Sequence, residues 1–202
     1  MAHHTGPKAK VNRRLGVMIF ESNGARKASE RRETPPGMHT RPGKLSGYGL
    51  AMREKQKIKY FYGLGERPLR RFFADAQKGK GNTGERLLQM CEMRLDNIIR
   101  RGGLTVTRPQ ARQGVAHAHF HVNGHKVDVP SMLLKPGDII YVKPATGLQN
   151  LYREMLERNG DSVAPFLSVD PSRLMIKVER YPSADEFSLP VEVGLVVELL
   201  SR

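Results

Sequence analysis

Cysteine and tryptophan are nearly absent from this chain, and long apolar runs are missing altogether. Cys91 is the only cysteine among the 202 residues, which excludes a disulfide framework and a zinc site built on cysteine ligands. No apolar run approaches the length that spans a bilayer, and no signal-peptide segment is visible, so we expect no membrane association. A disulfide-rich secreted protein and a transmembrane protein are therefore both disfavoured.

Acidic residues are also scarce, and this imbalance favours a polyanionic partner. The chain carries 34 Lys and Arg against 20 Asp and Glu, a formal net charge of +14. Residues 1–147 carry +17, whereas residues 148–202 carry −3. A positive field concentrates nucleic acid, while the acidic C-terminal stretch suits packing or a protein partner. The alternative is a generic basic protein whose charges are scattered and solvated.

The pattern of apolar residues predicts several helices behind an irregular basic arm. Pro, Gly and basic residues crowd residues 1–45, so we expect little core there. Cys91 falls on the apolar side of its helix and is interpreted as a small core residue. Thr107 is predicted to cap a further helix, with Gln110 at its third position. The other helices are predicted over 46–62, 66–78, 83–101 and near 149–158, with a helix favoured over a strand at 191–200.

The stretch "AHAHFHVNGH", residues 116–125, predicts a β-hairpin rich in histidine. Asn123-Gly124 supplies the positive φ values of a two-residue turn, which pairs His121 with Lys126. Alternation then directs one set of side chains to the core, and the histidines outward beside a lysine. A cation next to candidate ligands opposes a zinc or copper site. A surface that faces an anion is favoured over that site, and also over solvated histidines with no binding role. The core set is Phe120, Val122, Val127 and Val129, and the outward set is His119, His121, Lys126 and Asp128.

Arginines on the two preceding helical segments extend this basic surface. Arg94, Asn97 and Arg101 recur at helical spacing, opposite the apolar residues of the same helix. Arg108 and Arg112 are four residues apart on the next helix, whose N-terminus adds unpaired N–H groups. Guanidinium groups match phosphate geometry and stack on bases, so the sequence predicts one RNA-binding face.

Residues 94–142, "RLDNIIRRGGLTVTRPQARQGVAHAHFHVNGHKVDVPSMLLKPGDIIYV", closely resemble the RNA-binding module named after ribosomal protein S-four. The segments "PGMHTRPGKLSGYGLAMREKQKIKYFYGLGERPLRRFF" and "LPVEVGLVVELLSR" resemble the helical domain of the bacterial-type S-four family, so the likeness covers essentially the whole chain. Many members carry four N-terminal cysteines for zinc, and this chain resembles the zinc-free type.

The resemblance implies an α+β fold in which a small module of two helices, a β-hairpin and further short strands is inserted into a helical domain. We accordingly expect a basic arm at 1–45, a mainly helical domain at 46–93 and 148–202, and the module at 94–147. It further implies a structural protein of the small ribosomal subunit that binds ribosomal RNA, nucleates assembly of the subunit body and contributes to translational accuracy. Implied partners are small-subunit ribosomal RNA, the neighbouring protein S-five and messenger RNA at its entry path.

The resemblance also transfers site residues, and no cofactor, metal or small-molecule substrate is expected. Arg41 and Lys44 are expected near the messenger path. The expected RNA contacts are Arg94, Asn97, Arg100, Arg101, Thr107, Arg108, Arg112, His117, His119, Asn123 and Lys126, with Arg53, Lys55, Lys57, Arg70 and Arg71 from the helical domain.

Two other classes of protein use the same module. An RNA-modifying enzyme would need a catalytic domain, but the residues after 147 are too few, and no Gly-rich phosphate loop, paired-carboxylate cleft or nucleophile elbow appears. A heat-shock-type RNA-binding protein would not need the helical domain. We therefore expect a ribosomal protein of the cytoplasm and not an enzyme.

Overall fold

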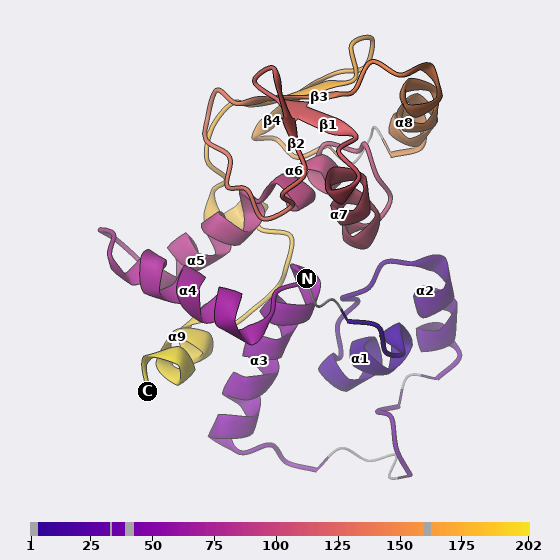
Figure 1. Cartoon of the computed structure of the whole chain (residues 1–202). Helices are drawn as coiled ribbons and strands as arrows, with labels where there is room; N and C mark the ends of the chain where they lie inside the picture. Colours follow the sequence, from indigo (N-terminus) through magenta and orange to yellow (C-terminus); the bar gives the residue numbers. More distant parts are fainter. Residues whose placement is uncertain (1–3, 33, 39–42, 160–162) are drawn as a thin grey trace. The chain divides into compact units, whose positions relative to one another are not determined.

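The chain forms two compact units, which we describe separately. The structure is a computed structural model that describes residues 4–32, 34–38, 43–159 and 163–202. The first unit, called the helical unit, comprises Met1–Leu87 and Leu189–Arg202, and the second, called the sheet unit, comprises Leu88–Ser188 (Figure 1). No helix in the described part of the chain is both long and apolar enough to cross a membrane.

The helical unit is built around amphipathic helices whose apolar faces the sequence predicted. In α4 (Glu66–Gln77), which the sequence predicted as a helix over 66–78, the buried residues Leu69, Phe72, Phe73 and Ala76 recur at helical spacing and share one face. The C-terminal segment is a helix, as favoured, and it packs against α3. The elements of this unit are α1 (Lys8–Leu15), α2 (Asn23–Glu30), α3 (Gly47–Phe61), α4 (Glu66–Gln77), the start of α5 (Thr83–Glu92) and α9 (Val193–Ser201).

The expectation of an irregular N-terminal arm is wrong for residues 8–30, which contain two helices, whereas the described residues 34–38 and 43–45 have no helix or strand. Helices α1 and α2 pack on each other and bury Leu15, Ile19 and Phe20. The side chain of Asn12 is also buried, and its Oδ1 accepts hydrogen bonds from the backbone N–H groups of Ile19 and Phe20 at 3.1 and 3.0 Å. The Asn12 side chain thus satisfies buried backbone N–H groups of the segment after α1. A small core therefore forms despite the polar composition.

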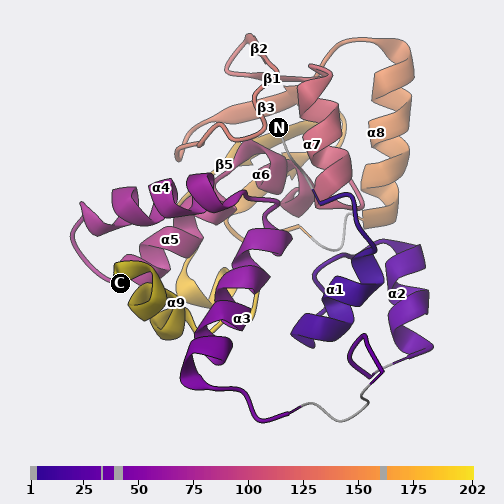
Figure 2. The same ribbon diagram turned by 60° about the horizontal axis from the view of Figure 1, so that its bottom comes forward.

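The sheet unit confirms the α+β expectation. Its five strands form an antiparallel sheet in the order β2-β1-β3-β5-β4, and α6 and α7 cover one face of it (Figures 1 and 2). An apolar cluster lies between them, from Leu95 and Ile98 of α6 to Phe120 and Ile140 of the sheet. The elements of this unit are α6 (Leu95–Arg101), α7 (Arg108–Ala116), β1 (Phe120–Val122), β2 (His125–Val127), β3 (Ile139–Val142), α8 (Thr146–Asn159), β4 (Leu167–Asp170), β5 (Met175–Val178) and the short 3-10 helix η2 (Ala184–Glu186).

The expected boundary after residue 147 is wrong, because residues 148–188 belong to the sheet unit. Strand β5 pairs with β3 from Ile139 to Tyr141, and β4 adds a fifth strand at the edge. The α8 residues Tyr152 and Leu156 are buried in the same core. Hydrogen bonds between strands that are distant in sequence decide this boundary, and local composition does not reveal them.

The single helix predicted over 83–101 is also wrong, because it breaks before Leu95. Arg94 has an extended backbone and forms an isolated antiparallel bridge with Leu133. Backbone hydrogen bonds from Leu134 N–H to the Met93 carbonyl and from Leu95 N–H to the Met132 carbonyl, both 2.9 Å, replace helical ones. Two helices, α5 and α6, result in place of one.

Candidate RNA-binding face

The face predicted for RNA lies in the sheet unit, where α7 begins beside α6. Thr107 caps α7, its side chain accepting a hydrogen bond from the backbone N–H of Gln110 at 3.4 Å, as the sequence predicted. The Gln110 side-chain oxygen in turn accepts from the N–H of Val106 at 3.1 Å. These bonds fix where α7 starts, and they therefore fix the positions of Arg108 and Arg112 one turn apart on it.

Arg94 does not lie on the surface that was expected for it. Its side chain is 2% exposed and makes a two-pronged ion pair with Asp96, with Nε–Oδ1 at 3.0 Å and Nη2–Oδ2 at 2.6 Å. The same Oδ2 accepts a hydrogen bond from Nη1 of Arg112 at 3.3 Å. Periodicity failed here because Arg94 precedes α6 with an extended backbone, which turns its side chain inward.

Asn97 is likewise buried, at 1% exposure, and the expectation that it faces solvent is wrong. Its amide nitrogen donates to the backbone carbonyl of Glu92 at 2.9 Å and to the carboxylate Oε2 of Glu92 at 2.6 Å. Its amide oxygen accepts from Nε of Arg108 at 2.8 Å. Asn97 therefore supports an arginine of the face without lying on its surface.

Arg100 and Arg101 are both half-buried, and Arg101 is engaged within the unit. Nη2 of Arg101 donates to the backbone carbonyl of Glu186 at 2.7 Å, and its guanidinium stacks over the ring of Phe166 at 5.6 Å. Its Nε lies 3.8 Å from the carboxylate of Glu92. Arg101 thus ties α6 to the segment that follows β5.

The hairpin has the predicted register but only part of the predicted surface. Phe120 pairs with Val127, His121 with Lys126, and Val122 with His125, as the two-residue turn requires. Phe120 and Val122 are buried as expected. The expected core residue Val129 is instead 49% exposed, because β2 ends at Val127 and the alternation stops there.

The four clustered histidines divide into two exposed and two packed side chains. His117 and His125 are exposed. His121 is half-buried and stacks flat on Tyr141, with ring centroids 5.2 Å apart. A ring nitrogen of His119 lies 2.9 Å from the Tyr152 hydroxyl, and burial lowers the pKa of this imidazole, helped by His117 and Lys143. The expectation that His119 and His121 project fully outward is wrong.

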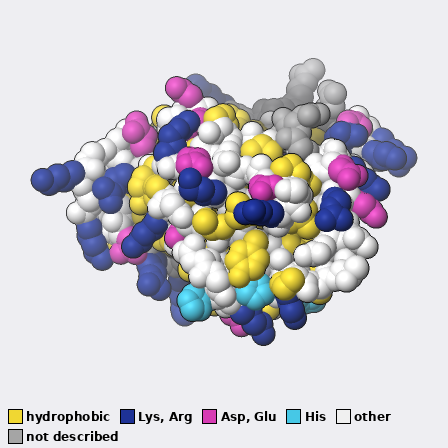
Figure 3. Space-filling model, turned by 90° about the horizontal axis from the view of Figure 1, so that it is seen from above, with side chains coloured by type: hydrophobic (Ala, Val, Ile, Leu, Met, Phe, Trp, Pro, Cys, Tyr) yellow, Lys and Arg dark blue, Asp and Glu magenta, His cyan; other side chains and the backbone are white. Residues whose placement is uncertain are grey.

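No metal centre is formed by the described residues. Among them, no group of three or more His, Cys, Asp or Glu side chains could hold an ion. In the face of the molecule drawn in Figure 3, histidines gather along one edge with Lys and Arg side chains close by. This distribution suits contact with an anion better than chelation of a cation.

Asn123 and Lys126 lie at the tip of the hairpin. Asn123 has the positive φ that the turn requires, +49°, and Gly124 has +89°. The Asn123 side chain is engaged with β3: its oxygen accepts from the N–H of Ile139 at 2.9 Å, and its nitrogen donates to Asp138 at 2.8 Å. Lys126 is exposed. Of the two residues, only Lys126 is positioned mainly for an external partner.

The side chains of the helical unit that were expected to contact RNA also differ in their exposure to solvent. Lys55 is buried and ion-paired with Glu66 at 2.5 Å, so the expectation that it is a surface contact is wrong. Arg70 and Arg71 have side chains 72% and 83% exposed, with ion pairs no closer than 3.9 and 4.0 Å. Burial raises the pKa of Glu66, but the hydrogen bonds and charges of Lys55 and Lys59 outweigh it, so this pKa lies below its ordinary value.

The four remaining expected contacts of this unit comprise three described residues and one that is not described. Lys57 pairs with Glu54 at 2.6 Å, and Nε of Arg53 donates to the Leu15 carbonyl at 3.2 Å. Lys44 is exposed, while Arg41 lies outside the described residues.

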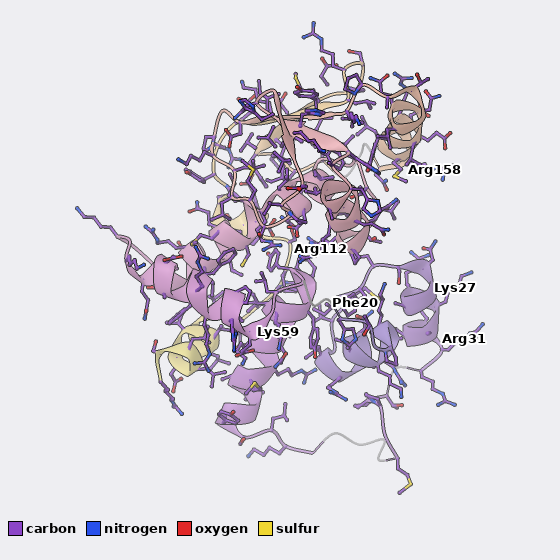
Figure 4. All side chains as sticks on the ribbon, viewed as in Figure 1. Phe20, Lys27, Arg31, Lys59, Arg112 and Arg158 are labelled. Carbon is purple, nitrogen blue, oxygen red and sulfur yellow. The ribbon has the colours of Figure 1, made fainter. Side chains whose placement is uncertain are left out.

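Sequence reasoning missed two groups of residues. Asp96 and Glu92 were not singled out, although the carboxylate two positions after Arg94 in "RLDN" was a usable signal. The exposed cations in and just after α2, Lys27 and the C-cap residue Arg31 among them, were assigned to an irregular arm (Figure 4). Their spacing of four residues was a helical signal that the surrounding Pro and Gly obscured.

Comparisons with known proteins agree with this architecture. A family model described as "Ribosomal protein S4/S9 N-terminal domain" matches residues 3–92, and one described as "S4 domain" matches residues 93–140. "Small ribosomal subunit protein uS4" of Rhodopirellula baltica is 53% identical over 202 residues, covering both chains completely. The proteins of the same name from Persephonella marina and Herpetosiphon aurantiacus are 43% and 42% identical, again over the full length of each chain.

Fold and matches together define a ribosomal protein that contains an S4 domain. The chain belongs to the family of small ribosomal subunit protein uS4, as its resemblance to the S-four family implied. The relatives are named as proteins of the small ribosomal subunit, which agrees with the expectation of a ribosomal protein.

Proposed function

We propose that this protein is a structural constituent of the small ribosomal subunit that grips folded ribosomal RNA with the α7 side of its sheet unit. The surface we assign to RNA, called the α7 face, consists of Thr107, Arg108, Arg112, His117 and Lys126. The observation that supports it best is that Arg108 and Arg112 are both held in place by acceptors on α6.

Binding by such a face depends on charge and shape more than on base sequence. Guanidinium groups displace counterions along phosphates, so affinity falls steeply as salt rises. Folded RNA offers grooves, junctions and 2′-hydroxyls that a rigid surface selects by geometry. The helical unit adds the exposed Arg70 and Arg71 as candidate phosphate contacts. All of these cations lie before residue 148, in the part of the chain that carries the positive net charge.

The test is a filter-binding assay with small-subunit ribosomal RNA transcribed in vitro. Arg108→Glu combined with Arg112→Glu should weaken binding by at least about a hundredfold, because two favourable charge contacts become repulsive. The matched control is Arg153→Glu with Arg158→Glu on α8, which changes the net charge equally at exposed positions (Figure 4). Equal losses in both double variants would refute the α7 face and leave only nonspecific charge attraction.

We also propose the finer roles that the family resemblance implies. The protein nucleates assembly of the subunit body, contributes to translational accuracy, contacts neighbouring protein S-five and works in the cytoplasm as part of the ribosome. Lys44, which is exposed, lies with Arg41 near incoming messenger RNA. Cross-linking of messenger RNA to reconstituted subunits should weaken for Lys44→Glu and persist for Lys143→Glu, an exposed lysine of the sheet unit.

A further inference from the structure

Arg108 and Arg112 of α7 contact a connected set of buried polar side chains, which the sequence did not reveal. Arg112 contacts Asp96 directly, at 3.3 Å, and Arg108 contacts Glu92 through Asn97. The carboxylate side chains are 7% and 0% exposed, so neither can meet RNA itself. Two negative charges therefore lie directly beneath the α7 face.

Arg94 contacts the Asp96 carboxylate from the side opposite Arg112. Arg94 occupies both carboxylate oxygens through its Nε and Nη2 atoms, which fixes the plane of the carboxylate. Oδ2 is shared with Arg112, whose side chain is 18% exposed. Because the buried carboxylate is paired on both sides, its charge is compensated, and Arg112 is kept in one orientation at the surface.

Glu92 fixes the orientation of the Asn97 side-chain amide. Oε1 of Glu92 accepts from both the backbone N–H and the hydroxyl of Ser188, at 3.0 and 2.7 Å. The Asn97 amide nitrogen donates to Oε2, as well as to the Glu92 backbone carbonyl. Turning the amide over would place its oxygen against these two acceptors, so the oxygen must face Arg108.

We propose that Asp96 and Glu92 are positioning residues for RNA binding: Asp96 orients Arg112 directly, and Glu92 orients Arg108 through Asn97. An arginine that is already oriented loses less rotational freedom when it binds a phosphate. This inference rests on the proposed α7 face and adds the residues that organise it. It also makes Ser188, at the end of the sheet unit, part of the same support.

The proposal predicts an effect opposite in sign to that of simple charge repulsion. A carboxylate beneath a phosphate-binding surface repels RNA, so removal of its charge would strengthen binding if repulsion were all that mattered. If the carboxylate orients arginines instead, its removal weakens binding. The direction of the change therefore decides between the two roles.

The experiment compares full-length variants in binding to small-subunit ribosomal RNA. Asp96→Asn should bind about tenfold more weakly, the equivalent of losing one charge-assisted hydrogen bond. The matched control is Asp170→Asn on β4, which also removes one negative charge but whose partner, Arg173, is 79% exposed. We expect the control to bind as tightly as the unaltered chain or slightly more tightly.

A double-mutant cycle separates orientation from general stability. In an Arg112→Gln background, Asp96→Asn should no longer weaken binding, because the arginine that it orients is gone. An equal loss in both backgrounds, or tighter binding by Asp96→Asn alone, would overturn the proposal. If Arg112→Gln itself leaves binding unchanged, the α7 face is wrong, which is a different failure from that of the positioning role.

A milder variant guards against loss of folding. Ser188→Ala removes one hydrogen bond to Glu92 and leaves the backbone one, so it should weaken binding about threefold with little change in thermal unfolding. Exposed Ser172→Ala in the same unit is the control. Identical affinities for Ser188→Ala and Ser172→Ala would refute the positioning role of Glu92, even if Asp96→Asn proves too unstable to assay.

Discussion

A ring nitrogen of His119 lies 2.9 Å from the hydroxyl oxygen of Tyr152, joining the start of the hairpin to α8. Gly114 of α7 packs against the same hydroxyl. Burial raises the pKa of Tyr152 to about 12, so the phenol stays protonated throughout the physiological range. The contact with Tyr152 gives His119 a structural role, and it leads to two predictions.

The first prediction concerns pH. The pKa of His119 is lowered from 6.5 by burial and by the neighbouring His117 and Lys143, so the folded protein favours the neutral imidazole. The unfolded chain then binds more protons at mildly acidic pH, and the stabilisation is present above about 6.5 and lost as the pH falls below it. Thermal unfolding should show a decline between pH 7 and 5 that His119→Gln reduces.

The control for this pH effect is His125→Gln, since His125 is exposed at the hairpin. Its unfolding temperature should follow the same pH curve as the unaltered chain. A curve for His119→Gln that coincides with both would show that His119 does not contribute to the acid sensitivity.

The second prediction concerns the packing of α7. A Cβ at Gly114 would lie 2.5 Å from the Tyr152 hydroxyl oxygen and 3.1 Å from the ring of Phe120. Gly114→Ala should therefore cost about 1–3 kcal/mol of unfolding free energy, because both rings belong to the core. Urea denaturation measures it. Gly147→Ala in α8, where nothing lies within 4 Å, should be neutral or slightly stabilising.

Local patterns were sufficient to predict much of the fold. The inner face of α4, the cap at Thr107 and the hairpin register each depend on residues close together in the sequence. The buried Cys91 was found the same way, and burial raises the pKa of its thiol well above the ordinary range. Short-range periodicity and turn chemistry determine such features, so a single sequence is enough.

Features that depend on contacts between distant segments were missed. Arg94 is turned inward because its backbone bridges to Leu133, and Glu92 is buried beside Ser188, 96 positions away. Helical spacing alone placed Arg94 and Asn97 on the surface, where their polar character suggested they belong. The start of α7 at the Thr107 cap was thus predicted, but the buried groups that contact Arg108 and Arg112 were not.

The third prediction concerns the hairpin tip, where two properties of Asn123 can be separated. Asn123→Gly keeps a residue that tolerates the positive φ of +49° but removes both side-chain hydrogen bonds to β3. Asn123→Ala loses the bonds and also strains the backbone. We expect losses of unfolding free energy of about 1 kcal/mol for the glycine variant and about 2 kcal/mol for alanine, by urea denaturation.

Equal losses for the two Asn123 variants would mean that the turn geometry costs nothing. RNA affinity gives a second readout of the same pair. Because the tip carries Lys126, a loosened turn should weaken RNA binding in the order of the stability losses. Unchanged affinity in both variants would remove the hairpin tip from the α7 face.

The fourth prediction concerns Asn12, which organises the N-terminal helices. Its side chain is 3% exposed and satisfies the N–H groups of Ile19 and Phe20. Asn12→Ala leaves these buried donors unpaired, at a cost of about 1–3 kcal/mol. We expect this loss to open α1 and α2 locally, raising amide hydrogen exchange over residues 8–30 while exchange in β1, β3 and β5 stays slow. Asn23→Ala, at an exposed position at the start of α2, should leave the exchange pattern unchanged. Faster exchange throughout the sheet of the Asn12 variant would instead show that the N-terminal helices unfold together with the rest of the chain.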